Sequence, residues 1–559
     1  MIGLNKIGLN QVQLNRLRLN APFPAYGKMA GGGGSGDGFP QLPGDVTRWH
    51  FGGLTNEMMA AMDDPRLEDA DGKGRFLSFK NFAWKEGSGI SDVYPGALVF
   101  DGVDDCGVCD NFPILTKEKG YTVVVLRQWD QDFLNTTLTG GLLSTRNYST
   151  GEGVAFEKIE SSNKGYWNLG AGGIIDFAKS PFTWQTSKQY NNVGILKGDK
   201  NHGKPLCVGC GLSGGQQCGR FAIWELVFLD HDATEEELTK IKDYFIKTYP
   251  WLFPDQAWTV VGKTNEDEDR ATIANITGNG NDLVLSNFGF AEGSGYGLYA
   301  YNFNLFSLRD ATVKPTDVKK DSFRIIGTGD RGNVLVLSNV SNSADWKIRI
   351  TGMKDGDHLL AGNANKSGDY VKITKDGVYT FQKQYAANAA NVIWYNSSQE
   401  VDVLVEQIPE YEGYLITDGV DDKITSSTFE MGNDWTVIGD WELINTGKND
   451  NAGIVKFNSI VIYNYNPILI NIKNGRNNLI PDQNTVNAIC SDGRIYSKDW
   501  KESIYNEETE STSKNLLTIG YSGNSYTKIA FKNLAIYPTV LSKEDCIKAY
   551  NYLQTLKAK

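Results

Sequence analysis

Short segments that are apolar throughout, or that alternate between apolar and polar residues, recur along most of the chain and predict β-strands. ALVF (97–100) and YLIT (414–417) each run into a glycine-containing turn. YTVVVL (121–126) and WTVI (435–438) are almost entirely apolar, which is typical of buried strands. In GLYAYNFNLFSL (297–308) the large side chains alternate, as expected for a strand with one buried face. The pattern therefore favours an all-β fold.

Two helices interrupt this pattern, and both have explicit start signals. Thr234 and Ser542 are favourable N-cap residues, and Glu237 and Asp545 follow three positions later, as a capping box requires. Apolar and aromatic residues then return at helical spacing: Leu238, Ile241 and Phe245 after the first cap, and Ile547, Tyr550 and Leu553 after the second. We expect one short helix to close each of two β domains.

An internal repeat divides the chain. YPGALVFDGVDD (94–105) recurs as YEGYLITDGVDD (411–422). Three further blocks match in the same order: GYTVVVLRQW with DWTVIGDWEL, PLCVGCGLSGG with NLLTIGYSGN, and the two capped helices with the strands before them. These matches indicate two copies of one domain, at 45–255 and 411–559. The residues between them, 256–410, contain further strand patterns and no strong helix, which predicts a third β-sandwich.

The motifs of the two copies resemble a known family. A strand ending in FDGVDD, a mid-domain L-x-x-G strand, and F-x-N-L-A-I-Y-P-x-x-L-S-x-E-D before a short helix resemble the concanavalin A-like, laminin-G-like jelly roll. The resemblance covers about 360 of the 559 residues. It implies two antiparallel sheets in each copy, with sugar- or protein-binding loops at one edge. The expected architecture is all-β, with two jelly-roll sandwiches flanking a third β-sandwich and an N-terminal docking peptide.

The first twenty residues repeat every five positions, with a leucine followed by an asparagine in each repeat: Leu4, Leu9, Leu14 and Leu19. A period of five forms no stripe on a helix and changes face at each repeat on a strand, so it fits a chain that turns a corner in every repeat. One coil of such a stack is too short to bury a core. The segment is either a frayed terminus or a peptide that becomes ordered against a partner. We favour the second interpretation, with 1–20 as an anchoring peptide and 21–44 as a glycine-rich linker.

Composition and charge exclude some classes of function. The net charge of −12 and the pI near 5.1 argue against nucleic-acid binding, because phosphate neutralisation needs clustered Lys and Arg. No apolar run reaches the length of a membrane span, and the first residues lack the apolar core of a signal peptide, so we expect folding in the cytoplasm. The basic residues of the arm precede the first acidic residue and suit an acidic protein surface: Lys6, Arg16, Arg18 and Lys28.

Two C-x-x-C pairs are candidate zinc ligands, namely Cys106 with Cys109 and Cys207 with Cys210. Four thiolates can hold zinc tetrahedrally if the fold brings the distant pairs together. The second copy has no cysteines at the matched positions, so the fold itself does not need such a site. Disulfides and plain buried thiols are the alternatives to this structural zinc.

The DGVDD motif of each copy is a candidate for calcium, because the family that it resembles often binds calcium through loop carboxylates. Asp-Gly is also an ordinary turn signal, and the motif follows a strand that has to turn. We prefer the turn interpretation to calcium for these six residues: Asp101, Asp104, Asp105, Asp418, Asp421 and Asp422.

Catalysis has little support in the sequence. There are four histidines, no G-x-S-x-G motif and no phosphate-binding loop, and the E-x-D-x-E pattern of glycan-cleaving jelly-roll enzymes is not found. Aromatic residues beside turns can instead stack on sugar rings, although most such residues belong to a core or its rim. The candidates for carbohydrate binding are Trp129, Trp167, Trp184, Tyr296, Tyr465 and Trp500.

The arrangement as a whole is similar to the head or tail fibre and decoration proteins of tailed phages, particularly crAss-like phages of gut Bacteroidetes. The resemblance implies a virion protein made in the host cytoplasm. Its N-terminus would grip capsid or tail proteins, its lobes would bind host-surface or mucosal glycans, and it would form a homotrimer. A bacterial surface adhesin is the first alternative and a glycan-degrading enzyme the second. We expect no enzyme activity, no nucleic-acid partner and no membrane insertion.

Overall fold

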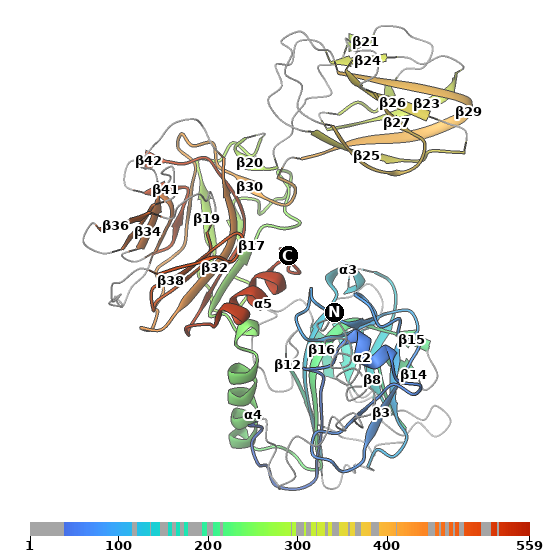
Figure 1. Ribbon diagram of the computed structural model, residues 1–559, viewed down its shortest axis with the longest axis vertical. Helices are drawn as coiled ribbons and strands as arrows, with labels where there is room; N and C mark the ends of the chain where they lie inside the picture. Colours follow the sequence, from blue (N-terminus) through green and yellow to red (C-terminus); the bar gives the residue numbers. More distant parts are fainter. Residues whose placement is uncertain are drawn as a thin grey trace, which may run out of the picture.

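The computed structural model describes residues 38–558 with internal gaps, so the anchoring peptide and most of the linker lie outside the described residues. The gaps are 114–119, 135, 146–154, 159–163, 168–172, 177–192, 198–204, 213–215, 292, 298–306, 309–314, 320, 330–333, 338–345, 356–357, 364–369, 382–390, 410, 445–452, 458–459, 464–468, 473–475, 480–485, 505–515 and 523–524. The described chain is mostly β-structure in several largely antiparallel sheets, as predicted (Figure 1). Within these ranges, no helix combines the length and the apolar character that a bilayer crossing requires.

The first lobe is a sandwich of two sheets. The first sheet has the order β12 (Val193–Lys197), β7 (Thr122–Trp129), β16 (Arg220–Leu229), β5 (Leu98–Asp101) and β4 (Gly89–Ile90), with β1 (Val46–His50) also on β16. The second sheet has the order β11 (Gly173–Asp176), β10 (Lys164–Trp167), β9 (Ala155–Lys158), β8 (Gly140–Ser144), β13 (Leu206–Val208), β6 (Cys106–Cys109), β3 (Phe76–Lys80) and β2 (Arg66–Glu68), with β14 (Cys210–Leu212) and β15 (Gln216–Cys218) beside β8. Leu77, Phe100, Val125 and Phe156 belong to one apolar core between the sheets.

The second lobe repeats this plan. One sheet has the order β20 (Gly295–Tyr296), β30 (Leu415–Ile416), β43 (Ile529–Tyr537), β32 (Thr436–Leu443), β37 (Val486–Cys490), β38 (Arg494–Ser497) and β39 (Glu502–Ile504), with β17 (Gln256–Thr259) also on β43. The other has the order β18 (Thr272–Ile273), β19 (Leu283–Ser286), β31 (Lys423–Thr425), β40 (Thr518–Ile519), β33 (Gly453–Phe457), β34 (Ile460–Tyr463), β35 (Leu469–Ile472) and β36 (Arg476–Leu479). A hairpin of β41 (Tyr521–Ser522) and β42 (Ser525–Tyr526) accompanies them.

The sheet pairing divides the chain differently from the expected boundary at residue 256. Strands β17 to β20, from residues 256–296, pair with strands of the second copy. The separate middle region is therefore inserted into the second lobe, between β20 and β30. Its strands are β21 (Ser307–Leu308), β22 (Pro315–Thr316), β23 (Ser322–Gly329), β24 (Val334–Leu337), β25 (Trp346–Thr351), β26 (His358–Asn363), β27 (Tyr370–Ile373), β28 (Gly377–Phe381) and β29 (Asn391–Ile408).

The long strand β29 organises this middle region. Its first part pairs with β24 and β26, and its last part pairs with β23 and β25. The region stands apart from both lobes at the upper end of the molecule (Figure 1). Its described elements are all β-strands, as the alternating sequence pattern predicted.

The longer helices lie on the outer faces of the two lobes and join them. Helix α4 (Glu235–Thr248) has the full predicted capping box between Thr234 and Glu237, and Ser542 caps α5 (Lys543–Leu553). Both helices, with the 3-10 turn η1 (Pro250–Leu252), contribute to one apolar core that includes outer-face residues of β7 and β32. Strand β7 is buried at every position for this reason, since side chains on one face line the sandwich and those on the other join the core shared with the helices.

Candidate functional site

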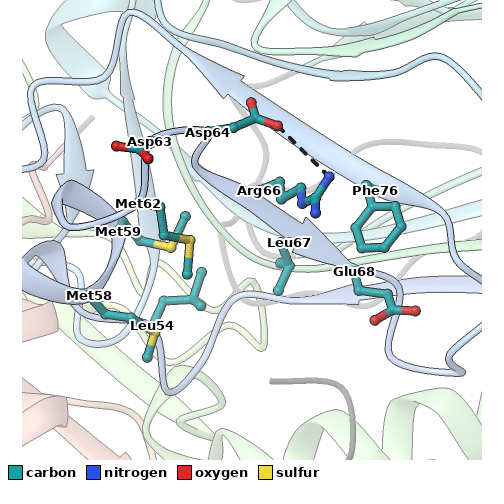
Figure 2. A pocket seen from close by; sticks show the side chains of 10 residues that line it. All are labelled: Leu54, Met58, Met59, Met62, Asp63, Asp64, Arg66, Leu67, Glu68 and Phe76. Carbon is teal, nitrogen blue, oxygen red and sulfur yellow. Dashed lines mark ion pairs between the residues drawn. The ribbon is translucent and has the colours of Figure 1, made fainter. Parts of the chain in front are cut away.

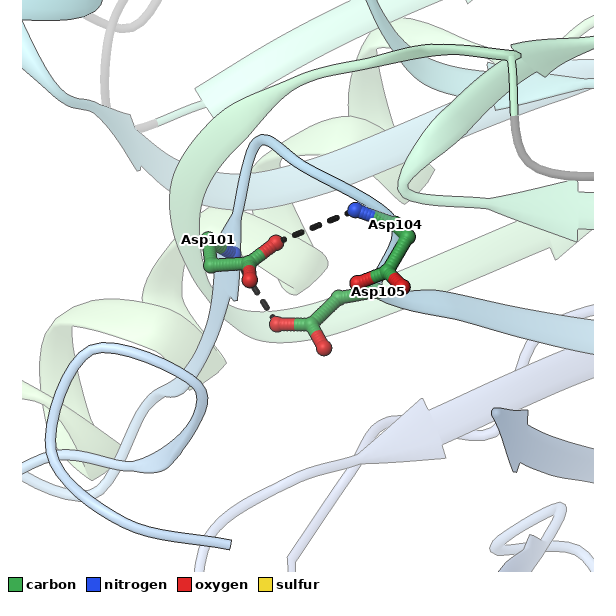
Figure 3. Close-up of side chains that lie close together, drawn as sticks. All are labelled: Asp101, Asp104 and Asp105. Carbon is green, nitrogen blue, oxygen red and sulfur yellow. Dashed lines mark hydrogen bonds between the residues drawn. The ribbon is translucent and has the colours of Figure 1, made fainter. Parts of the chain in front are cut away.

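Each lobe contains a hydrogen-bonded corner built on its DGVDD motif. In the first lobe, the carboxyl of Asp105 accepts hydrogen bonds from the hydroxyl of Ser88 and from the backbone N–H of Asp101, both at 3.0 Å. The carboxylate of Asp101 accepts from the backbone N–H groups of Val103 (2.8 Å) and Asp104 (3.4 Å). Figure 3 shows these aspartates around the turn. The same bonds recur in the second lobe, where Asp422 accepts from Ser294 and from the backbone of Asp418.

These hydrogen bonds hold the turn of the DGVDD motif closed, so the motif has a structural role. Asp105 and Asp422 are both fully buried. Desolvation by burial raises the pKa of the Asp105 carboxyl to about 7 and that of Asp422 to about 6, although the hydrogen bonds lower it. One oxygen from each aspartate of the triplet lies within 4.8 Å of the others in each lobe. The turn interpretation accounts for the contacts, and calcium binding stays the less favoured, untested alternative.

The four cysteines predicted as zinc ligands do not meet in one place. Cys106 and Cys109 begin and end strand β6, so their side chains leave opposite faces of the sheet. Cys109 lies in the core between the sheets, whereas Cys106 lies in a separate cluster with Cys210 and Cys218. Cys210 forms a disulfide with Cys218, and Cys207 is buried and lies outside this disulfide. The geometry therefore does not support a four-thiolate site at these residues.

The aromatic residues proposed for sugar binding are mostly enclosed where the structure describes them. Trp129 is fully buried in the first core, and Tyr296 is buried with its phenol donating to the carbonyl of Arg270 at 2.7 Å. Trp500 is partly exposed and packs edge-on against Tyr550 with ring centroids 5.7 Å apart. The side chains of the other three candidates lie outside the described residues: Trp167, Trp184 and Tyr465.

A cavity of 480 Å³ opens on the first lobe, beside helix α2 (Asn56–Ala60) and strand β2. The cap of Thr55 on the backbone N–H of Met58 starts the helix, and the side chain of Asn56 fixes it by two hydrogen bonds to the backbone of Ile90. Figure 2 shows the methionines on one side of the cavity and the β2–β3 side chains on the other. The lining residues are Leu54, Met58, Met59, Met62, Asp63, Asp64, Arg66, Leu67, Glu68 and Phe76.

This cavity combines an apolar floor with a charged rim. Leu54, Met59 and Leu67 are buried at its base. On the rim, the guanidinium of Arg66 lies over the ring of Phe76, 4.8 Å from its centroid, and forms a loose ion pair with Asp64 at 3.9 Å. A ligand with an apolar face and several hydroxyls would find both kinds of partner here.

A cluster of methionines in the sequence is a signal for this cavity. Three of the seven methionines of the chain fall within 58–62. The matched loop of the second lobe is shorter and carries an acidic run instead, since residues 57–65 of the first lobe correspond to 266–271 of the second. The cavity is therefore an addition to one copy and not a requirement of the shared fold.

A second polar cluster, beneath α4, is also specific to the first lobe. The fully buried carboxylate of Glu225 accepts hydrogen bonds from the phenols of Tyr249 (2.9 Å) and Tyr244 (3.2 Å). The ring Nδ1 of His50 lies 2.6 Å from the same oxygen, and Arg48 forms an ion pair with the other oxygen at 3.6 Å. Burial raises the pKa of the Tyr249 phenol, which keeps it a hydrogen-bond donor. The cluster ties α4 to β1 and β16.

Comparisons with known proteins give faint likenesses. No protein-family model and no curated protein matches the chain. Among solved structures, the binding domain of botulinum neurotoxin serotype G matches with a TM-score of 0.24 and 9% identity, over 66% of this chain and 98% of that one. The serotype D ligand-binding domain in complex with N-acetylneuraminic acid matches with a TM-score of 0.24 and 10% identity, over 60% and 94% of the two chains.

A carbohydrate-binding tandem domain is also among the matches. The CBM22-1–CBM22-2 tandem of Paenibacillus barcinonensis Xyn10C has a TM-score of 0.14 and 11% identity, covering 44% of this chain and all of that one. TM-scores of this size carry no argument about function. The sandwich architecture therefore rests on the strand order and on the cores described above.

Proposed function

We propose that this chain is a glycan-binding virion protein, and that the cavity beside α2 is a glycan site of its first lobe. The observation that supports the glycan site is that the Arg66–Phe76 stack and several carboxylates surround the apolar base of the cavity. A sugar ring offers an apolar C–H face to such a floor and hydroxyl groups to such a rim. The exposed carboxylates of Asp63 and Asp64 supply acceptors for hydroxyl groups.

The glycan site is tested by screening the full chain against a glycan array and measuring the affinity of the best ligand by calorimetry. Asp64→Asn and Arg66→Gln change the rim without opening the core, because both side chains are exposed. We expect each to weaken binding about tenfold, the typical cost of losing a charged hydrogen-bonding group. Glu268→Gln, in the matched loop of the second lobe, is the control that keeps full affinity. Unchanged affinity in both rim variants would exclude this cavity as the site.

The virion role is supported by the chain's charge and by the layout of its start. The leucine pentads and the basic residues precede a glycine-rich linker and an acidic body. A segment rich in aliphatic and basic residues gains affinity for an acidic assembly through both apolar burial and charge attraction. On this proposal the arm binds capsid or tail proteins, the chain assembles as a trimer, and the lobes project outward without enzyme activity.

Deletion of residues 1–20 tests this role separately from glycan binding. The truncated protein should keep its melting temperature and its glycan affinity, but should be missing from particles purified after infection. Normal incorporation of the truncated chain would refute the anchoring role. Light scattering coupled to size-exclusion chromatography on the full chain measures whether it is trimeric.

A further inference from the structure

The interior of the first lobe contains an arginine without a hydrogen-bonding partner. Arg127 belongs to β7, and its side chain is fully buried. Its Nε, Nη1 and Nη2 atoms make no hydrogen bond to any group of the described chain. The centroid of the Phe156 ring on β9 lies 4.8 Å from the guanidinium carbon. A planar cation with five donors is thus held against an aromatic face between the sheets.

Burying this positive charge destabilises the folded state unless a further group binds to it. A buried charge without a counter-ion loses its hydration, and here it regains only the cation–π attraction of the Phe156 ring. Burial is the cause that lowers the pKa of Arg127, to about 9, and no neighbouring carboxylate of the described chain opposes it. The guanidinium therefore stays charged at neutral pH and keeps its donors unsatisfied.

The second lobe demonstrates that the fold does not need this charge. Arg127 pairs with Ile223 across the sheet, and the matched pair in the second lobe is Trp441 with Phe531. Trp441 is fully buried in the core of its own lobe. An apolar ring fills the position in one copy, whereas the other copy retains a cation there. A residue that is unfavourable for stability and unnecessary for the fold is best explained by a ligand.

The strand order places Arg127 and Phe156 close to one edge of each sheet. β7 is separated from the edge of its sheet by the single strand β12, and β9 lies two strands from the edge strand β11 of the facing sheet.

We propose that Arg127 binds an oxyanion, a carboxylate or a sulfate group, inside the first sandwich. The guanidinium fork donates two parallel hydrogen bonds to such a group, and Phe156 holds the fork in place. The oxyanion is either a free anion or the acidic group of a saccharide. The saccharide source rests on the glycan-binding function proposed above, whereas the anion site itself does not.

The test compares sulfate binding by the full chain, by Arg127→Met and by Arg220→Gln. Arg220 is half exposed on β16 and serves as the control for loss of a positive charge in the same lobe. Equilibrium dialysis with radiolabelled sulfate, at an ionic strength fixed with sodium chloride, should give one bound sulfate per chain for the wild type and for Arg220→Gln. Arg127→Met should bind at least about tenfold more weakly. Equal binding by Arg127→Met, or no binding by the wild type, would overturn the proposal.

Thermal unfolding separates this result from a folding defect. Without sulfate, Arg127→Met should melt at or above the wild-type temperature, because an unpaired buried charge is gone. Sulfate should raise the melting temperature of the wild type and not that of the variant. Arg127→Trp, which copies the residue of the second lobe, is the second variant and should behave in the same way. A sulfate-induced shift that persists in both variants would contradict the site.

A further experiment with saccharides distinguishes the two sources of the anion. A sulfated disaccharide and its unsulfated parent are titrated into the wild type, into Arg127→Met and into the cavity variant Asp64→Asn. Binding of the sulfated sugar that is lost in Arg127→Met but kept in Asp64→Asn supports an acidic glycan at Arg127. Sulfate binding without disaccharide binding supports a free anion and leaves the cavity proposal unaffected.

Discussion

The phenol of Tyr552 donates a 2.9 Å hydrogen bond to the side-chain carbonyl of Gln128, although the two residues lie 424 positions apart. Tyr552 belongs to α5 of the second lobe and Gln128 to β7 of the first, and both are buried. The same interface includes the phenol of Tyr537, which donates to the carbonyl of Trp251 at 3.0 Å. The two lobes therefore share a core and a set of buried hydrogen bonds, and they form one packed unit.

Tyr552→Phe should lower the free energy of unfolding by about 1–2 kcal/mol, because it removes a buried hydrogen bond and leaves the Gln128 carbonyl without this donor. Urea denaturation followed by tryptophan fluorescence measures the loss. Tyr521→Phe is the control, since the Tyr521 hydroxyl makes no hydrogen bond within the described chain. An equal effect of the two substitutions would argue against the inter-lobe bond.

The buried aspartates of the two DGVDD motifs, Asp105 and Asp422, should make the free energy of unfolding depend on pH. The native state keeps the proton of Asp105 up to a pH of about 7, whereas the unfolded chain loses it near 3.8. The free energy of unfolding contributed by this group is therefore full below about pH 4 and falls as the pH rises through 7. Asp105→Asn should remove this fall, and Asp422→Asn should remove the matching fall that ends near pH 6.

Urea denaturation at several pH values between 4 and 8 measures these contributions to the free energy of unfolding. The double variant should lack both of them. A wild type whose stability rises across this range, with no change in slope in either variant, would contradict the raised pKa values.

Glu225→Gln should destabilise the first lobe by about 3–5 kcal/mol, because it removes the negative partner of the buried Arg48. The second lobe suggests the compensating change, since Ala257 and Asn533 stand at the matched positions. The double variant Arg48→Ala/Glu225→Asn should therefore be more stable than Glu225→Gln. Calorimetry measures all three proteins, and a double variant that is less stable than the single one would refute the pairing.

Thiol counting tests the cysteine arrangement. Of the seven cysteines of the chain, two form the one disulfide, and the other five are buried and lie outside it. Ellman's reagent should react with five thiols in guanidinium chloride without reductant and with seven after reduction. The native protein should react slowly, because burial restricts access and raises the pKa of Cys106 and, to about 12, that of Cys109. Seven reactive thiols before reduction would contradict the disulfide.

The sequence was sufficient for the repeat, the capped helices and the β-rich class, because each depends on local patterns. The helix after Thr234 needed only its cap and its apolar spacing. The repeat also extends further than its DGVDD block, since KNFAWKEGSG (80–89) matches SNFGFAEGSG (286–295). Asn81 and Asn287, at the start of these stretches, share a positive φ and donate to matched carbonyls. This match would have placed 256–296 in the second lobe.

The candidate sites were harder to predict, because they depend on faces and partners that spacing does not reveal. A C-x-x-C pair converges in a turn but diverges in a strand, and Cys106–Cys109 turned out to be strand β6. Trp129 looked like a residue beside a turn, yet it packs on Phe133 and Phe221 inside the core. The absence of a hydrogen-bonding partner for Arg127 in the described chain is visible only once the surrounding sheets are placed.

The place of the middle region has a consequence for how this molecule can change. β20 and β30 are paired neighbours in the second lobe, as β4 and β5 are in the first, so the chain leaves and re-enters the sandwich at one spot. The first lobe bridges that spot with residues 91–97, and the second lobe spans it with residues 297–414. The connection between β20 and β30 is therefore a point at which another segment can replace the middle region. A different domain, or a short connection copied from the first lobe, can stand there while β20 and β30 keep their register.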